Sequence, residues 1–130
     1  MNCSSGEFAV MKVLDDMKVN YEYDSTFEVK NDKGNYLRWD FIIDVPDKDL
    51  KLFIEYDGRQ HFVPLRFGGV SKNKAQKAFE RQQQNDKIKN DFVSNNPDKY
   101  KLLRIKYTDF GRVKELVSDF IIEFSSWGEE

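Results

Sequence analysis

The sequence predicts one α/β domain in which a mixed sheet is flanked by helices, with the element order αβββαβα. Its 130 residues suffice for one hydrophobic core and not for two. Segments with apolar residues at helical spacing alternate along the chain with segments rich in β-branched and aromatic residues. No repeat, low-complexity tract or linker divides the chain, so the single domain is expected over residues 1–130.

The first half of the chain predicts one helix followed by three strands. Ser4 and Glu7 have the spacing of a capping box, and apolar residues then recur at helical intervals. A four-residue turn beginning at Pro46 separates two runs of β-prone residues, which predicts a hairpin. The expected helix covers residues 4–18, and the expected strands cover 20–29, 37–45 and 50–58.

The second half predicts a long helix, a fourth strand and a closing helix. Residues 58–71 are rich in glycine and are expected to form an irregular loop beside the hairpin. Residues 72–93 contain neither Gly nor Pro and are rich in good helix formers. Residues 99–107 are β-prone, and the amphipathic pattern of residues 112–127 predicts the closing helix. The core is expected over about residues 4–107.

Composition excludes several classes of protein. The net charge of −2 argues against a protein that binds nucleic acid by bulk positive charge. One cysteine, Cys3, allows no internal disulfide, and one histidine allows no zinc cluster of the Cys/His type. The start of the chain lacks the features of a signal peptide, and no apolar stretch is long enough to cross a membrane. We therefore expect a cytoplasmic protein.

Pairing across the hairpin predicts two chemically different faces. If the turn closes around residues 47 and 48, Asp40 lies opposite Glu55, with Asp57 on the same face. The other face is apolar throughout and is expected in the core. Its residues are Leu37, Trp39, Phe41, Ile43 and Val45 on one strand and Leu50, Leu52, Ile54 and Tyr56 on the other.

The facing carboxylates of Asp40 and Glu55 predict a cation site. Like charges directly opposite one another on a sheet cost about 0.2–1 kcal/mol. A divalent cation converts this repulsion into binding, and Mg²⁺ is commonly held by one or two carboxylates together with phosphate oxygens. Neutralisation by Arg38 and Lys51 on a merely solvated face is the alternative. Replacing either acid by alanine is expected to leave the fold intact or more stable, because the repulsion is relieved.

Five short blocks carry a resemblance to a known superfamily. They are Ser5-Gly6-Glu7, Arg38-Trp39-Asp40-Phe41, the run from Ile54 to Phe62, Asp86-Lys87-Ile88-Lys89-Asn90, and Leu102-Leu103-Arg104-Ile105. In this order they resemble restriction-endonuclease-like nucleases of the PD-(D/E)XK superfamily. The similarity is greatest to the branch of very-short-patch repair endonucleases and of phage and intron-encoded homing endonucleases, and it covers about residues 4–107.

The resemblance implies a set of catalytic residues and the cofactor Mg²⁺ or Mn²⁺. It implies that Asp40 and Glu55 bind the metal, assisted by Asp57, and that Glu7 is an accessory carboxylate. It places Gln60 and His61 near the attacking water or the leaving group. The superfamily carries a lysine where this chain has Asp57, so the general base stays open, the candidates being His61, Lys87 and Lys89.

The long helix supplies the one strongly basic segment. Residues 72–89 carry six basic and two acidic side chains, a local charge of +4. Such a segment is expected to follow a phosphate backbone, although a solvated helix face explains it equally well. Asp86 shares a helix face with Phe79 and is expected to help hold a metal or to orient His61. The expected DNA-contacting residues are Lys74, Lys77, Arg81, Lys87 and Lys89.

These inferences predict a metal-dependent endonuclease that hydrolyses phosphodiester bonds in double-stranded DNA, as the catalytic domain of a homing-type enzyme. Cutting both strands requires a homodimer or two successive events. A non-catalytic nuclease-fold module that binds DNA or protein is the alternative, and a structure-specific or RNA-directed nuclease fits the same residues.

Overall fold

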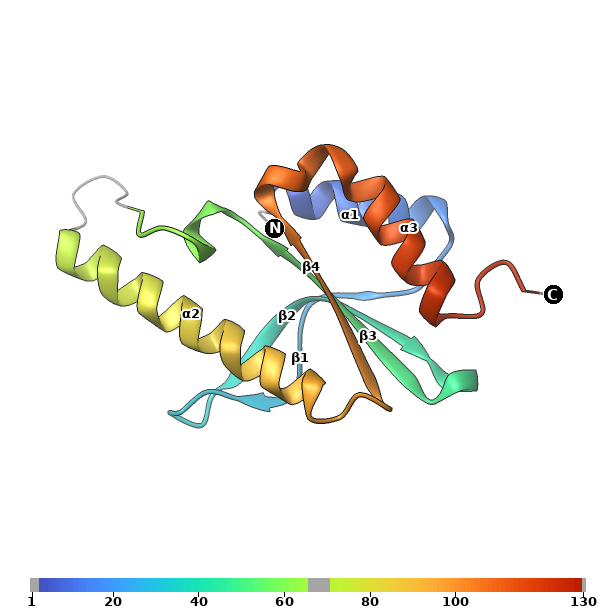
Figure 1. Ribbon diagram of the computed structural model, residues 1–130, viewed down its shortest axis with the longest axis horizontal. Coiled ribbons are helices and arrows are strands. Elements are labelled where there is room, and N and C mark those ends of the chain that lie inside the picture. The colour runs from blue at the N-terminus through green and yellow to red at the C-terminus, as the bar shows by residue number, and fades with distance from the viewer. Residues whose placement is uncertain (1–2, 66–70, 130) are drawn as a thin grey trace.

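The predicted order αβββαβα is confirmed by the computed structural model, which describes residues 3–65 and 71–129 of this chain (Figure 1). The element ends agree with the prediction to within a few residues. Residues 66–70 of the predicted loop lie outside the described residues, as do residues 1, 2 and 130. The elements are α1 (Ser5–Asp16), β1 (Glu22–Lys30), β2 (Tyr36–Val45), β3 (Leu50–Asp57), α2 (Lys72–Ser94), β4 (Tyr100–Lys106) and α3 (Val113–Phe124).

Local signals in the sequence fix where several of these elements begin. The hydroxyl of Ser4 accepts the backbone N–H of Glu7 at 3.1 Å, and the Glu7 carboxylate accepts the backbone N–H of Ser4 at 3.0 Å. This reciprocal pair is the predicted capping box. Ser71 caps α2 in the same way by accepting the backbone N–H of Lys74. The turn between β2 and β3 is a short 3₁₀ helix that starts at Pro46.

The four strands form one mixed sheet in the order β1-β2-β3-β4. The pairs β1/β2 and β2/β3 are antiparallel, whereas β3 and β4 are parallel and are connected through α2. The pairs Ile42 with Phe53 and Asp44 with Lys51 confirm the register that the sequence predicts for the hairpin. The paired register of β2 and β3 ends at Phe41 and Ile54, immediately before the predicted acid pair.

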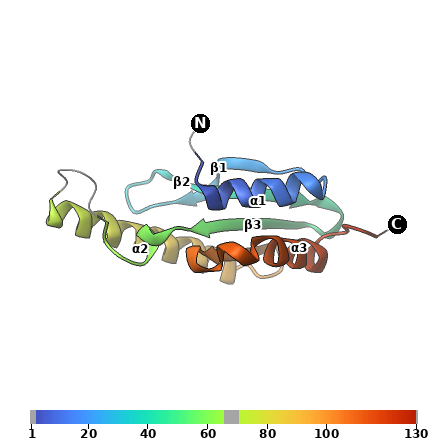
Figure 2. The same cartoon turned by 90° about the horizontal axis from the view of Figure 1, so that it is seen from above.

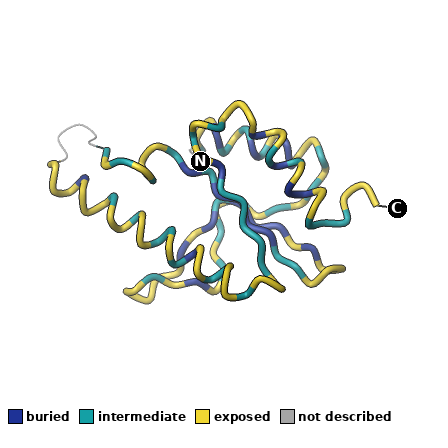
Figure 3. Tube along the Cα trace, viewed as in Figure 1, coloured by how far each residue is buried: buried dark blue, intermediate teal, exposed yellow. Residues whose placement is uncertain are grey.

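Helices cover both faces of the sheet (Figures 1 and 2). Helices α1 and α3 lie side by side on one face, and α2 lies on the other. Burial is concentrated along the strands, whereas the outer sides of the helices are exposed (Figure 3). No helix within residues 3–65 and 71–129 has the length and apolar character needed to cross a membrane.

Two hydrophobic clusters result from this layering. On the side of α1 and α3, Phe41, Ile43, Leu52 and Ile54 pack with apolar residues of both helices and with Ile105. On the side of α2, a second cluster contains Val29, Leu37, Trp39, Ile42 and Phe53, with Phe92 of α2 packed against it.

The predicted positions of Leu37 and Trp39 are wrong. Both were expected on the face of Phe41, yet both lie in the cluster beneath α2, where the rings of Trp39 and Phe53 have centroids 4.0 Å apart. Strict alternation along β2 is therefore broken between Trp39 and Phe41. In β1, Asp24 lies between the partners of these two residues and has a positive φ of 50°, a local irregularity that accompanies the change of face.

Gly6 brings the first turn of α1 unusually close to the sheet. A Cβ atom at this position would lie 2.1 Å from the ring of Tyr56 on β3, a distance that no side chain can occupy. Glycine therefore allows α1 to contact Tyr56 directly. Because Glu7 is the next residue, this close approach sets the position of the carboxylate that the sequence predicted to be an accessory acid.

Candidate functional site

Asp40 and Glu55 lie where the backbone hydrogen bonds between β2 and β3 end. Beyond that point, hydrogen bonds from their side chains connect the two strands. The Glu55 carboxylate accepts the backbone N–H of Asp40 at 2.6 Å, and the Asp40 carboxylate accepts the backbone N–H of Tyr56 at 2.8 Å. Side-chain oxygens thus take the place of backbone carbonyls. The two predicted acids therefore lie together at the point where β2 and β3 separate, which we call the fork. Beyond the fork, β3 remains paired with β4 only, and Glu55 is the partner of Arg104.

Lys89 of α2 is the counter-ion of Glu55. Its ammonium group contacts the Glu55 carboxylate and donates a hydrogen bond of 2.6 Å to the backbone carbonyl of Arg38. It also lies 5.1 Å from the centre of the Trp39 ring. Lys89 and Glu55 are only 6% and 2% exposed, so this is a buried ion pair. Arg38 and Lys51, the counter-ions considered from the sequence, pair with Asp24 and Asp44 instead.

Asp40 stands in an environment that disfavours its charge. Burial raises the pKa of this carboxyl to about 8, reinforced by the negative charges of Glu55 and Glu7 and opposed by the hydrogen bond from Tyr56 and by Lys89. Glu7 is held beside the site by its capping box and by a hydrogen bond of 2.9 Å from the hydroxyl of Tyr23. A cation is the partner that would remove the repulsion among these carboxylates.

The raised pKa predicts that the metal-free protein becomes less stable as pH rises. Between the ordinary pKa of 3.8 and the folded value of about 8, Asp40 is protonated when folded and ionised when unfolded. Unfolding then releases a proton, so the free energy of unfolding falls by up to about 1.4 kcal/mol per pH unit. Urea unfolding in EDTA at pH 5 to 8 measures this slope.

Asp40→Asn is the matched control for this slope. The amide cannot ionise, so the decline should be shallower in this variant than in the wild-type protein. Burial also raises the pKa of Asp57, against the opposing charges of Arg104 and His61, and this contribution is common to both proteins. Identical slopes in the two proteins would contradict the assignment of a neutral Asp40.

A polar cavity of about 280 Å³ opens over this fork. Asp40 and Glu55 contribute from the strands, and Lys89 contributes from α2. Five of the six catalytic residues that the sequence or its resemblance predicts, all except Asp57, therefore line one cavity together with Lys89. Its lining residues are Glu7, Leu37, Arg38, Asp40, Glu55, Tyr56, Gln60, His61, Gln82, Asn85 and Lys89.

Asp57 belongs to a second cluster, built around His61. Arg104 of β4 donates to both carboxylate oxygens of Asp57, at 2.9 and 3.2 Å. The Nδ1 atom of His61 lies 2.8 Å from the carboxylate of Asp86 and 3.5 Å from that of Asp57. The predicted contact between Asp86 on the long helix and His61 is thus present, and Arg104 also reaches Asp86 at 3.5 Å.

In this second cluster, unlike at the fork, an arginine contacts both carboxylates. Burial tends to raise the pKa of Asp86, but the hydrogen bond with His61 and the charge of Arg104 outweigh it and leave the pKa below its usual value. Asp57, His61 and Asp86 offer ligand atoms within 4.8 Å of one another, which is a spacing that could hold a metal ion. Because Arg104 contacts both acids, a cation there would meet a fixed positive charge. At the fork, Lys89 compensates Glu55, whereas Asp40 and Glu7 form no ion pair within residues 3–65 and 71–129.

The predicted DNA-contacting residues fall into two groups. Lys74, Lys77 and Arg81 are exposed on the half of α2 that extends past the sheet (Figure 1). Lys87 is exposed and forms an ion pair of 2.6 Å with Asp91. Lys89 does not lie on this exposed surface, because it is buried against Glu55. Of the two helix lysines considered as a general base, only Lys89 reaches the acids.

Sequence reasoning missed the roles of Arg104 and Tyr23. Arg104 interrupts the apolar run of Leu102, Leu103 and Ile105, and a lone arginine within an apolar strand is a signal that a carboxylate faces it. Tyr23 gave no comparable signal, because its hydroxyl meets Glu7 only after α1 packs beside β1.

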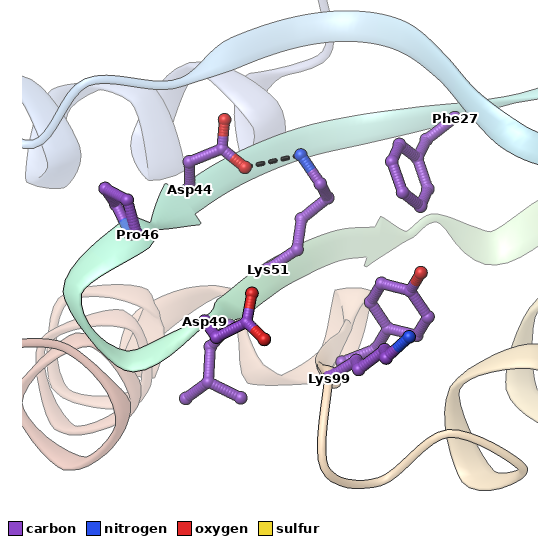
Figure 4. A pocket seen from close by; sticks show the side chains of 8 residues that line it. Phe27, Asp44, Pro46, Asp49, Lys51 and Lys99 are labelled. Atoms are coloured by element: carbon purple, nitrogen blue, oxygen red, sulfur yellow. Dashed lines mark hydrogen bonds and ion pairs between the residues drawn. The ribbon is translucent and has the colours of Figure 1, made fainter.

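A larger cavity of about 450 Å³ lies at the turn end of the hairpin and contains none of the predicted site residues (Figure 4). Phe27, Lys51 and Lys99 line it, and the Lys51 ammonium is engaged by Asp44. Its lysine and aromatic residues stabilise the hairpin through this ion pair and through the stacking of Lys51 on Phe27 at 4.7 Å.

Comparison of the chain with protein-family models, curated proteins and solved structures gives no significant match. The functional argument therefore rests on the geometry of the site.

Proposed function

We propose that this protein is a metal-dependent DNA endonuclease that hydrolyses phosphodiester bonds. One observation carries the proposal: two carboxylates, those of Asp40 and Glu55, meet at a strand fork in a polar cavity, with a buried lysine against one of them. Burial and, after it, the negative charge of Glu55 raise the pKa of Asp40, so the protein maintains this carboxyl at a cost in stability. Binding of a cation by the two carboxylates would offset this cost.

The donor set fits a hard divalent cation. Carboxylate oxygens are the side-chain ligands that Mg²⁺ prefers, and it keeps open positions for water and phosphate oxygens. Asp40 and Glu55 would hold the ion, and Glu7 lines the same cavity. When bound, Mg²⁺ or Mn²⁺ lowers the pKa of water and stabilises negative charge on the scissile phosphate.

Two side chains of the cavity are suited to proton transfer and charge stabilisation. His61 is oriented through Nδ1 by Asp86, so Nε2 is the atom through which it exchanges a proton with water or a leaving group. The Lys89 ammonium is fixed by Glu55 and by the carbonyl of Arg38, and supplies positive charge beside the acids. Asp86 acts as a positioning residue for His61.

The exposed basic residues of α2 provide the contact to nucleic acid. Lys74, Lys77 and Arg81 lie on the part of α2 that leads towards Asn85 and Lys89, both of which line the acid cavity. In a chain of net charge −2, this local positive segment is where phosphate groups would bind. A DNA strand whose phosphate groups contact these residues along α2 would reach the acid cavity.

Incubation of supercoiled plasmid with the folded protein tests the proposal. We expect nicking or linearisation in Mg²⁺ or Mn²⁺, and none in EDTA. Circular dichroism of the same sample controls for folding. DNA retarded on a gel but not cut by the folded protein in either metal would contradict the nuclease and favour a DNA-binding module of the same fold.

A further inference from the structure

A second cavity, of about 220 Å³, adjoins the acid cavity. It lies between the segment that follows β3 and the N-terminal half of α2, which face one another in Figure 1. Gln60 and Gln82 line both cavities, so the two share a wall. The rest of the lining is apolar and consists of Val63, Leu65, Ala75, Ala78 and Phe79.

The shared wall carries two amide side chains, and the orientation of one of them, Gln82, is fixed by a hydrogen bond. The Gln82 amide donates through Nε2 to Asp86 at 3.0 Å, and Asp86 in turn binds His61 at 2.8 Å. This hydrogen bond identifies the nitrogen end of the Gln82 amide. The oxygen end, Oε1, is therefore held in place as a hydrogen-bond acceptor. Gln60 folds back over Gly58, where a Cβ atom would lie 2.5 Å from the Gln60 Oε1 atom.

We propose that this apolar cavity binds a nucleobase of the nucleotide next to the scissile phosphate. The inference rests on the proposed function, because it takes the acid cavity as the phosphate site. Sites that hold a base outside the helical stack combine aromatic or apolar walls with hydrogen bonds to the edge of the base. Here Phe79 and its aliphatic neighbours form the walls, and Gln60 and Gln82 supply the edge contacts.

The position of the cavity has a consequence for the substrate. A base can enter it only after leaving the duplex stack, which costs a few kcal/mol in paired DNA and least where the base is already unpaired. Occupancy would also contact Gln82, which is linked through Asp86 to His61. Binding of the base and orientation of the histidine are thereby connected through three side chains.

Nucleotide binding can be measured without cleavage. The probes are dAMP and 2-deoxyribose 5-phosphate, which share the sugar phosphate and differ by the base. In Mg²⁺, we expect dAMP to shift the NMR signals of the Ala78 methyl group and the Phe79 ring saturably, and the sugar phosphate to leave them unchanged. Ala78→Phe adds a ring to the lining of the cavity and should weaken dAMP binding on the order of tenfold, the contribution of one stacked base.

Gln83→Phe is the matched control, because it adds the same ring to a position of α2 that is exposed, like Ala78, but lies outside the cavity lining. It should bind dAMP like the wild-type protein. Three results would overturn the proposal: no saturable shift up to about 10 mM dAMP, equal shifts with both probes, or unchanged binding in Ala78→Phe. Mg²⁺-dependent hydrolysis of bis(p-nitrophenyl) phosphate by the wild-type protein tests the nuclease separately, since that substrate has no nucleobase.

Discussion

Asp40→Asn is expected to lower metal-dependent plasmid cleavage by about 10²–10⁴-fold, equivalent to several kcal/mol of transition-state stabilisation. The amide keeps an oxygen that can accept the backbone N–H of Tyr56, as the Asp40 carboxylate does at 2.8 Å. It cannot supply the negative charge that a divalent cation requires. The fold should therefore persist while cleavage is lost. Initial rates in Mg²⁺, measured beside urea unfolding curves of both proteins, test the two halves of this expectation.

Asp44→Asn is the matched control for cleavage. Asp44 lies on the same strand and its carboxylate is 69% exposed, paired with Lys51 near the hairpin turn. Its replacement should leave the cleavage rate within about twofold of wild type, because exposed ion pairs contribute little. Full activity in a folded Asp40→Asn variant would remove Asp40 from the metal site and with it the proposed mechanism.

Glu55→Ala is expected to lower the free energy of unfolding by about 3–5 kcal/mol, because it leaves the buried ammonium of Lys89 without its counter-ion. The substitution also removes the acceptor of the Asp40 backbone N–H. Equilibrium unfolding in urea, with the midpoint and slope fitted separately, measures the loss. A loss below about 1 kcal/mol would mean that Lys89 finds solvent or another partner.

The double variant Glu55→Ala/Lys89→Met separates charge burial from packing. Methionine retains much of the lysine's apolar length and removes the unpaired charge, so a large part of the lost stability should return. Lys89→Met alone should also be destabilising, because Glu55 is then the uncompensated buried charge. A double variant as unstable as the sum of the two single variants would show that the pair does not interact energetically.

These expectations differ from what the hairpin pattern alone predicts. The sequence suggested that removing either acid relieves a repulsion and leaves the fold intact or more stable. For Asp40 that reasoning applies to the charge, which burial and the neighbouring carboxylates disfavour, but alanine would also remove the acceptor of the Tyr56 backbone N–H. For Glu55 it changes, because the pattern of two strands contains no information about a lysine 34 residues later in the chain.

Features that depend on neighbouring residues could be predicted from the sequence. The capping box at Ser4 and the register around Pro46 follow from local chemistry, and both are present. The face of Trp39 could not be predicted from strict alternation, because the strand is irregular beside Asp40. An alternation rule assumes an unbroken strand, and that assumption fails at the fork.

The same distinction between local and long-range features applies to the residues of the candidate site. Asp40 and Glu55 could be paired from the sequence because they belong to one hairpin. Asp57 was grouped with them by its position on the same face, whereas Arg104 from β4 draws it into the cluster with His61. Neither Arg104 nor Lys89 can be assigned a partner until β4 and α2 are packed onto the sheet.

At the fork, the carboxylates of Asp40 and Glu55 accept backbone N–H groups in place of backbone carbonyls. The two positions are nevertheless under different evolutionary constraints. Position 40 needs an oxygen that accepts the N–H of Tyr56, and asparagine would satisfy that need if the proposed cleavage were no longer selected. Position 55 needs a charge as long as Lys89 is buried against it. In lineages that had lost activity, position 40 should therefore drift first, and positions 55 and 89 should change together. Survival of Glu55 in a relative could follow from folding alone, whereas survival of Asp40 would point to the proposed chemistry.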